Sequence, residues 1–97
     1  MAPTAYEIAK AGGRHAGLVR RYEGEATRQV EKAVASLERR ISEHLDKIAR
    51  PEDHLPVGVG ARQIRHLVDA YWPREIAGYR SQIEVLRGIL KERGNGP

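Results

Sequence analysis

The chain has 97 residues and no cysteine, so it fits one small domain without disulfide bonds or thiolate metal ligands. Lys and Arg number 17 against 13 Asp and Glu, a net charge of +4, and 13 of these 17 cations are arginines. Arginine pairs bidentately with phosphate, so the composition is typical of nucleic-acid binders, although many other basic proteins share it. No signal peptide is recognisable, and no apolar run approaches the roughly 18 residues of a membrane span.

The N-terminal quarter predicts two short helical pieces, over residues 1–11 and within residues 12–24. The second piece carries the sequence GGRHAGLVRRYEG, in which His15 and Tyr22 flank a short apolar turn. The two glycines allow close backbone approach, so this turn could tuck His15 against another element. The surrounding cations are Arg14, Arg20 and Arg21.

The strongest periodic segment covers residues 26–50 and predicts one long helix. Apolar residues at steps of three and four form a single stripe: Val30, Val34, Leu37, Ile41, Leu45 and Ile48. Pro51 ends this helix, because the residue before a proline avoids the helical region. Residues 51–60 are rich in proline and glycine and predict an irregular loop.

Residues 61–93 predict a broken pair of helices. A helical pattern begins near Ala61 and is interrupted by Pro73, which suits the first turn of a new helix over about residues 74–93. The stripe of this helix is Ile76, Tyr79, Ile83, Leu86 and Leu90. No alternating strand pattern occurs. The sequence therefore predicts an all-α single domain, a small helical bundle with two long antiparallel helices and shorter ones.

One flank of the helix at 26–50 carries candidate chemistry. At about 100° per residue, Arg40, His44 and Lys47 share this flank. The neighbouring cations disfavour a charged imidazole, so a neutral His44 could accept a proton while Arg40 and Lys47 stabilise phosphate charge. Alternatively, His44 is a packing residue at the edge of the core and the cations form a solvated face.

Together these residues suit metal-independent cleavage of RNA to a cyclic phosphate, which needs a base, an acid and cations at the phosphoryl group. His15 is the second candidate base or acid, the alternative being a basic loop with an incidental histidine. Trp72 could stack on a nucleobase or fill the core. The candidate catalytic residues are His15, Tyr22, His44 and Lys47. The candidate substrate-binding residues are Arg14, Arg20, Arg21, Arg40 and Trp72.

No cofactor or metal site is predicted. The four histidines fit no zinc spacing, and the chain has neither a phosphate loop nor a dinucleotide-binding fingerprint. His54 and His66 are expected to have no catalytic part.

Three segments resemble a known family: GRHAGLVRRYEG, VEKAVASLERRISEHLDKIARP and YWPREIAGYRSQIEVLRGIL. Together they are similar to a C-terminal toxin domain of bacterial polymorphic toxins, the variable tips of Rhs-repeat, contact-dependent inhibition and secretion-system effectors. The resemblance covers about Gly12 to Leu90, and the connection HLPVGVGAR departs from it by lacking an aromatic residue. The matching positions are His15, Tyr22, Ser36, Glu38, Ile41, His44, Lys47, Ile48, Trp72, Pro73, Ile76, Gln82, Leu86, Gly88 and Leu90.

The resemblance implies a domain that is secreted or delivered within a larger parent toxin, acts in the cytoplasm of the target cell and is neutralised by a cognate immunity protein. Such tips include nucleases, deaminases, ADP-ribosyltransferases and membrane toxins. The basic residues favour a ribonuclease whose substrate is cytoplasmic RNA, with tRNA as one candidate, and no membrane partner. A DNase toxin and a non-catalytic module, either immunity-type or nucleic-acid-binding, are the alternatives.

Overall fold

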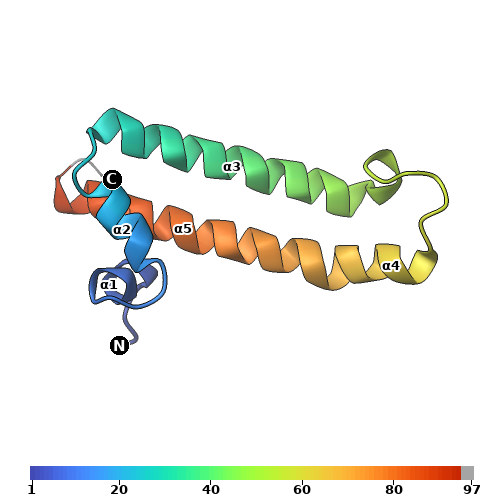
Figure 1. Cartoon of the computed structure of the whole chain (residues 1–97), viewed down its shortest axis with the longest axis horizontal. Helices are drawn as coiled ribbons and strands as arrows, with labels where there is room; N and C mark the ends of the chain where they lie inside the picture. Colours follow the sequence, from blue (N-terminus) through green and yellow to red (C-terminus); the bar gives the residue numbers. More distant parts are fainter. Residues whose placement is uncertain (95–97) are drawn as a thin grey trace.

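The fold is all-α, as the sequence predicts. The computed structural model describes residues 1–94, and no strand occurs among them. Helices α3 and α5 lie side by side and run in opposite directions, while α1 and α2 pack at one end of α5 (Figure 1). The elements are α1 (Ala5–Lys10), α2 (Ala16–Tyr22), α3 (Thr27–Ala49), the 3₁₀ turn η1 (Pro51–Asp53), α4 (Ala61–His66), the π-helix η2 (Leu67–Tyr71) and α5 (Trp72–Glu92).

The main core forms where the apolar face of α3 meets α5. Val30 and Leu86 are fully enclosed there, at 0% exposure. Complete burial of a side chain of this size contributes about 1.5–3 kcal/mol, so this seam fixes how the two helices align. Its buried members are Val30, Val34, Leu37, Ile83, Leu86, Ile89 and Leu90.

The apolar stripe of α3 departs from the prediction in its C-terminal half. Leu45 is 47% exposed, whereas His44 is 7% exposed. From Ile41, a 3.6-residue period continues to His44 and then to Ile48, so the histidine takes the core position that the sequence assigned to leucine. The predicted stripe is therefore right as far as Ile41 and wrong at Leu45.

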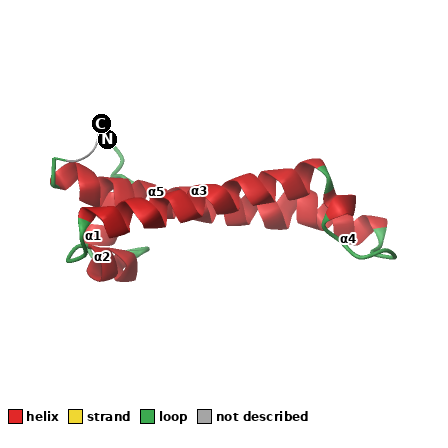
Figure 2. Cartoon of the chain, turned by 90° about the horizontal axis from the view of Figure 1, so that it is seen from above, coloured by secondary structure: helices red, strands yellow, loops and turns green. Residues whose placement is uncertain are grey.

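Pro73 does not break the second helical region. The chain passes from α4 through η2 into α5 without a loop (Figure 1). Seen from above, the loops lie toward the two ends of the helix pair (Figure 2). In η2 the Trp72 N–H donates to the Leu67 carbonyl, a bond across five residues. In a regular α-helix the Pro73 ring would clash with the Asp69 carbonyl, and the wider π turn makes room for it. The predicted break was wrong, and α5 begins at Trp72 instead of residue 74.

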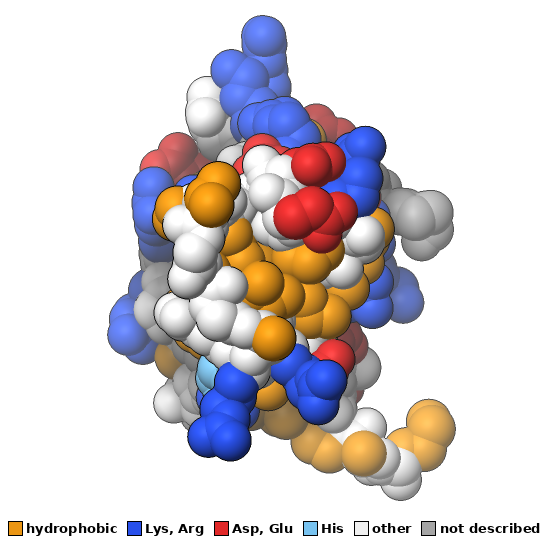
Figure 3. Space-filling view, turned by 90° about the vertical axis from the view of Figure 1, so that its right-hand side faces the viewer, with side chains coloured by type: hydrophobic (Ala, Val, Ile, Leu, Met, Phe, Trp, Pro, Cys, Tyr) orange, Lys and Arg blue, Asp and Glu red, His pale blue; other side chains and the backbone are white. Residues whose placement is uncertain are grey.

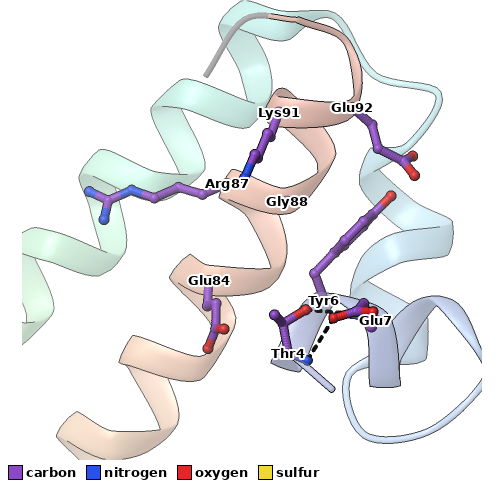
Figure 4. A pocket seen from close by; sticks show the side chains of 8 residues that line it. All are labelled: Thr4, Tyr6, Glu7, Glu84, Arg87, Gly88, Lys91 and Glu92. Atoms are coloured by element: carbon purple, nitrogen blue, oxygen red, sulfur yellow. Dashed lines mark hydrogen bonds between the residues drawn. The ribbon is translucent and has the colours of Figure 1, made fainter. Parts of the chain in front are cut away.

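Helix α1 docks on α5 through Tyr6 and Gly88. A Cβ at Gly88 would lie 2.2 Å from the Tyr6 Cγ, so glycine alone lets the ring pack this closely. Figure 4 shows Tyr6 beside Gly88, with Thr4 and Glu7 at the start of α1. Those two form a capping box: the Glu7 N–H donates to the Thr4 hydroxyl at 3.1 Å, and the Thr4 N–H donates to the Glu7 carboxylate at 2.9 Å.

Arg93, just after α5, joins the end of this helix to the connection between α2 and α3. Its guanidinium donates to the backbone carbonyls of Tyr22 at 3.2 Å and Glu23 at 2.8 Å, and to the Thr27 hydroxyl at 3.3 Å. Carbonyls at the end of a helix lack partners within it, so the arginine satisfies the end of α2. These bonds fix Tyr22 relative to α5.

Two glycines of α5 give a matched test of this packing. Gly88→Ala should lower the free energy of unfolding by about 1–3 kcal/mol, because the new methyl overlaps Tyr6. Gly78→Ala should raise it by about 1 kcal/mol, because alanine favours the helix and a Cβ there meets no side chain within 4 Å. Urea unfolding of both variants measures the difference. Equal stabilities would show that α1 does not depend on the contact with Gly88.

Candidate functional site

A polar groove of about 310 Å³ lies where α2, α3 and α5 meet. Helix α2 contributes Arg21 and Tyr22, α3 contributes Ser36 and Arg40, and α5 contributes Gln82. Three of the candidate site residues, Arg21, Tyr22 and Arg40, therefore come together here. The apolar side chains lining the groove are Leu18, Ala33, Leu37 and Leu86.

Both arginines of the groove lie beside an aromatic ring. The Arg21 Cζ is 5.0 Å from the centroid of the Tyr22 ring, and the Arg40 Cζ is 5.9 Å from that of Tyr79. Such cation–π contacts orient a guanidinium while leaving its N–H donors available. Two guanidinium groups on one groove suit a phosphate, and the Tyr22 phenol adds a group that can donate a proton.

His44 does not line the groove but lies buried between α3 and α5. Its Nδ1 is 2.9 Å from the Arg40 carbonyl oxygen, and its Nε2 is 3.0 Å from Oε1 of Glu75. Its ring meets Tyr79 edge-on, with centroids 5.2 Å apart. Both ring nitrogens therefore have partners within the protein. This burial and these contacts support the alternative, that His44 is a packing residue at the edge of the core.

Glu75 is the residue that sequence reasoning missed. The prediction considered only the charges that share a helix with His44, namely Arg40 and Lys47. Glu75 lies 31 residues further along the chain and reaches His44 only because α5 packs against α3. The amphipathic pattern of each helix could have identified this pair only if the register between the two helices were known.

Lys47 and Trp72 lie further along the same pair of helices. Trp72 is 5% exposed, so of the two roles considered for it the structure supports filling the core over stacking on a nucleobase. The Lys47 Nζ lies 5.9 Å from the centroid of its ring. The predicted flank of Arg40, His44 and Lys47 does face α5, but only Arg40 lines the groove.

His15 lies in a second, smaller pocket of about 250 Å³, at the turn between α1 and α2. Ala5, Ile8, Arg14 and Ser81 line the pocket with it. Its backbone is left-handed, with φ 69° and ψ 18°, and its Nε2 is buried without a hydrogen-bond partner. Burial lowers the pKa of His15 and the nearby Arg14 guanidinium lowers it further, so the imidazole is held neutral at neutral pH.

His15 and His44 do not share a cleft. His15 lies beside Ser81 and His44 beside Tyr79, and these two positions point about 160° apart around α5. The prediction that both rings reach one phosphodiester was therefore wrong. Arg14 stays with His15, while Arg20 is exposed on α2 and lines neither the pocket nor the groove.

Three further hollows among residues 1–94 are lined by none of the candidate residues. At the α4 end, apolar side chains gather in the centre of the face that Figure 3 shows. Ala61, Ile64 and Val68 line a depression there, together with Arg65 and Asp69. Within residues 1–94, no group of three His, Cys, Asp or Glu side chains is placed to hold a metal ion, and no helix has the length and apolar character of a membrane span.

Replacing His44 tests its place in the core. His44→Ala should lower the free energy of unfolding by about 1–3 kcal/mol, because Glu75 and the Arg40 carbonyl lose their partner. His66→Ala, at an exposed position of α4, should change it by less than about 0.5 kcal/mol. Urea unfolding compares the two variants. A His44→Ala protein as stable as His66→Ala would indicate that His44 is solvated.

The lowered pKa of His15 should make stability depend on pH. The unfolded chain, with a histidine pKa near 6.5, takes up the proton more readily than the folded chain. Unfolding is therefore favoured as the pH falls from 6.5 through the lower, folded-state pKa. His15→Gly removes the ring and accepts the positive φ, so it should lose less stability than the wild type between about pH 7 and about pH 5. Urea unfolding at both pH values measures this, and equal losses would contradict the shifted pKa.

Comparisons with protein-family models, with curated proteins and with solved structures found no match to this chain.

Proposed function

We propose that this chain is an antibacterial toxin domain that cleaves RNA in the groove between α2, α3 and α5, without a metal ion. One observation carries the proposal: the groove joins Arg21 and Arg40, from two different helices, with the Tyr22 phenol. The net charge of +4 favours approach to a polyanion. The toxin assignment is supported by the sequence resemblance over Gly12 to Leu90.

The chemistry is transesterification within the RNA. The 2′-oxygen attacks the adjacent phosphorus, a cyclic phosphate forms and the bond to the 5′-oxygen breaks. Arg21 and Arg40 donate hydrogen bonds to the phosphoryl oxygens, where negative charge builds in the transition state. The Tyr22 hydroxyl gives its proton to the departing 5′-oxygen, and water takes the proton of the 2′-hydroxyl. Tyr22 thus takes the acid role that the sequence gave to a histidine pair.

A groove of this kind also suggests how such a toxin would be controlled. The domain would be delivered within a larger parent protein and act on cytoplasmic RNA of the target cell. A cognate immunity protein would neutralise it by placing carboxylates over Arg21 and Arg40, in competition with the phosphate.

A non-catalytic nucleic-acid-binding module is the second candidate. The observation that favours it is that no histidine lines the groove, while His44 has both ring nitrogens engaged. Such a module would use the same two arginines to hold a phosphate backbone and would leave the nucleic acid intact.

The test is RNA cleavage by the purified protein and by cells that express it. Wild-type expression should arrest bacterial growth and yield discrete RNA fragments, and cleavage in vitro should persist in EDTA. Arg21→Ala and Arg40→Ala should each reduce the rate about 10²–10³-fold, because each removes a donor to the transition state. Arg39→Ala is the matched control, since Arg39 is exposed on α3 beside Arg40 but does not line the groove.

The other outcomes separate the alternatives. Arrest with intact RNA would overturn the ribonuclease proposal and leave the toxin proposal standing. Cleavage of DNA that EDTA abolishes would identify a metal-dependent DNase. RNA binding without arrest or cleavage, weakened by Arg21→Ala and Arg40→Ala, would identify the non-catalytic module.

A further inference from the structure

We propose that the pocket at the turn between α1 and α2 binds one nucleobase of the strand whose phosphate lies in the groove. The pocket residues are Ala5, Ile8, Arg14, His15 and Ser81. The inference rests on the proposed function for the nature of the strand, and it deepens that function by adding a subsite for a base.

The first support is the unpartnered nitrogen of His15. Its Nε2 is buried and has no hydrogen-bond partner among residues 1–94. Leaving such a group unpaired costs about 1–3 kcal/mol, so folded proteins keep few of them. A neutral imidazole nitrogen either donates or accepts, depending on the tautomer, and the edge of a nucleobase offers groups of both kinds.

The second support is the strained turn that holds His15. Its φ of 69° lies in the left-handed region, which costs a residue with a side chain about 1–2 kcal/mol. The turn is tight because Gly13 lies against α1: a Cβ at Gly13 would come 2.7 Å from Cγ2 of Ile8, and the Gly13 N–H donates to the Ile8 carbonyl at 2.9 Å. Strain of this kind concentrates at sites that hold a ligand.

The third support is the chemistry of the lining. Ala5 and Ile8 supply apolar surface, while His15 and the Ser81 hydroxyl supply neutral hydrogen-bonding groups. A base extruded from a strand has flat apolar faces and a polar edge, which match such a lining. A phosphate needs several charged donors, and Arg14 is the one cation that residues 1–94 contribute to this lining. Arg14, which also lines the pocket, is exposed and could pair with the phosphate attached to the base.

The pocket and the groove are neighbours on α5. Ser81 lines the pocket and the next residue, Gln82, lines the groove. The pocket and the groove are also neighbours on α2. His15 occupies the N-cap position of this helix, and Leu18, about one turn later, lines the groove. A single strand that crosses the first turn of α2 therefore places its phosphate and a base on either side of that turn.

The test is NMR spectroscopy of the full 97-residue chain with separate probes for base and phosphate. Adenosine, guanosine, cytidine and uridine carry the bases without phosphate, and inorganic phosphate carries the charge alone. At least one nucleoside should shift the His15 ring signals and the Ser81 amide signal in a saturable way. Phosphate should shift the side-chain signals of Arg21 and Arg40 and should shift the His15 ring much less than the nucleoside does.

Two variants show whether the ring makes the contact. His15→Gly accepts the positive φ and should abolish the nucleoside shift at Ser81 while keeping the phosphate shifts in the groove. His15→Asn, which also tolerates this backbone and keeps a polar group, serves if the glycine variant does not fold, and it should weaken nucleoside binding at least 10-fold. His66→Ala is the histidine control and should bind nucleosides as the wild type does.

Three results would overturn the base pocket: no response of His15 to any of the four nucleosides, a phosphate response at His15 equal to the nucleoside response, or unchanged nucleoside binding by His15→Gly or His15→Asn. Each of these results leaves the cleavage assay with Arg21→Ala and Arg40→Ala unaffected. Conversely, nucleoside binding at His15 in a protein that cleaves no RNA would support the base pocket and overturn the ribonuclease proposal.

Discussion

Helix α5 is the element on which the other helices pack: α1, α2 and α3 all bury apolar side chains against it. Val85 and Leu86 are adjacent in sequence and both are completely buried, yet they belong to different clusters. Leu86 packs in the seam with α3, while Val85 packs with Ala9 of α1 and Val19 of α2. A chain of 97 residues buries a smaller fraction of its surface on folding than a larger domain does. Covering one helix on more than one side increases the apolar area that such a short chain buries.

The groove is a consequence of this arrangement. Helices α2 and α3 both pack on α5, but each uses its own strip of that helix, so a channel stays open between them. Leu37 and Leu86, which line the groove, also belong to the core, while its polar lining residues are Arg21, Tyr22, Ser36, Arg40 and Gln82. Arg21 and Arg40 place their charges over this channel while each keeps contact with an aromatic ring, Tyr22 and Tyr79 respectively.

Periodicity made the fold class and the long helix predictable. Apolar residues that recur every 3.6 residues lie on one face of a helix, and that face is stable in water only when another element covers it. The same reasoning failed at positions 44 and 45, because either residue could continue the apolar stripe of α3. Leu45 was assigned to the stripe on polarity, although His44 continues the geometric period and finds Glu75 as a partner. Charge clusters within α2 and α3 were visible in the sequence, but which clusters meet depends on contacts between helices. The sequence therefore identified Arg21 and Arg40 as separate candidates but did not show that they line one groove. It also did not show that His15 and His44 lie on different sides of α5.

The π turn has a consequence for the far end of the molecule. A π-helix corresponds to an α-helix that holds one additional residue within a turn. Without that residue, α4 would rotate about 100° around the axis that it shares with α5. The depression lined by Ala61, Ile64 and Val68 would then face another direction at this end of the molecule. The number of residues in Leu67–Tyr71 thus sets the direction in which α4 presents its side chains.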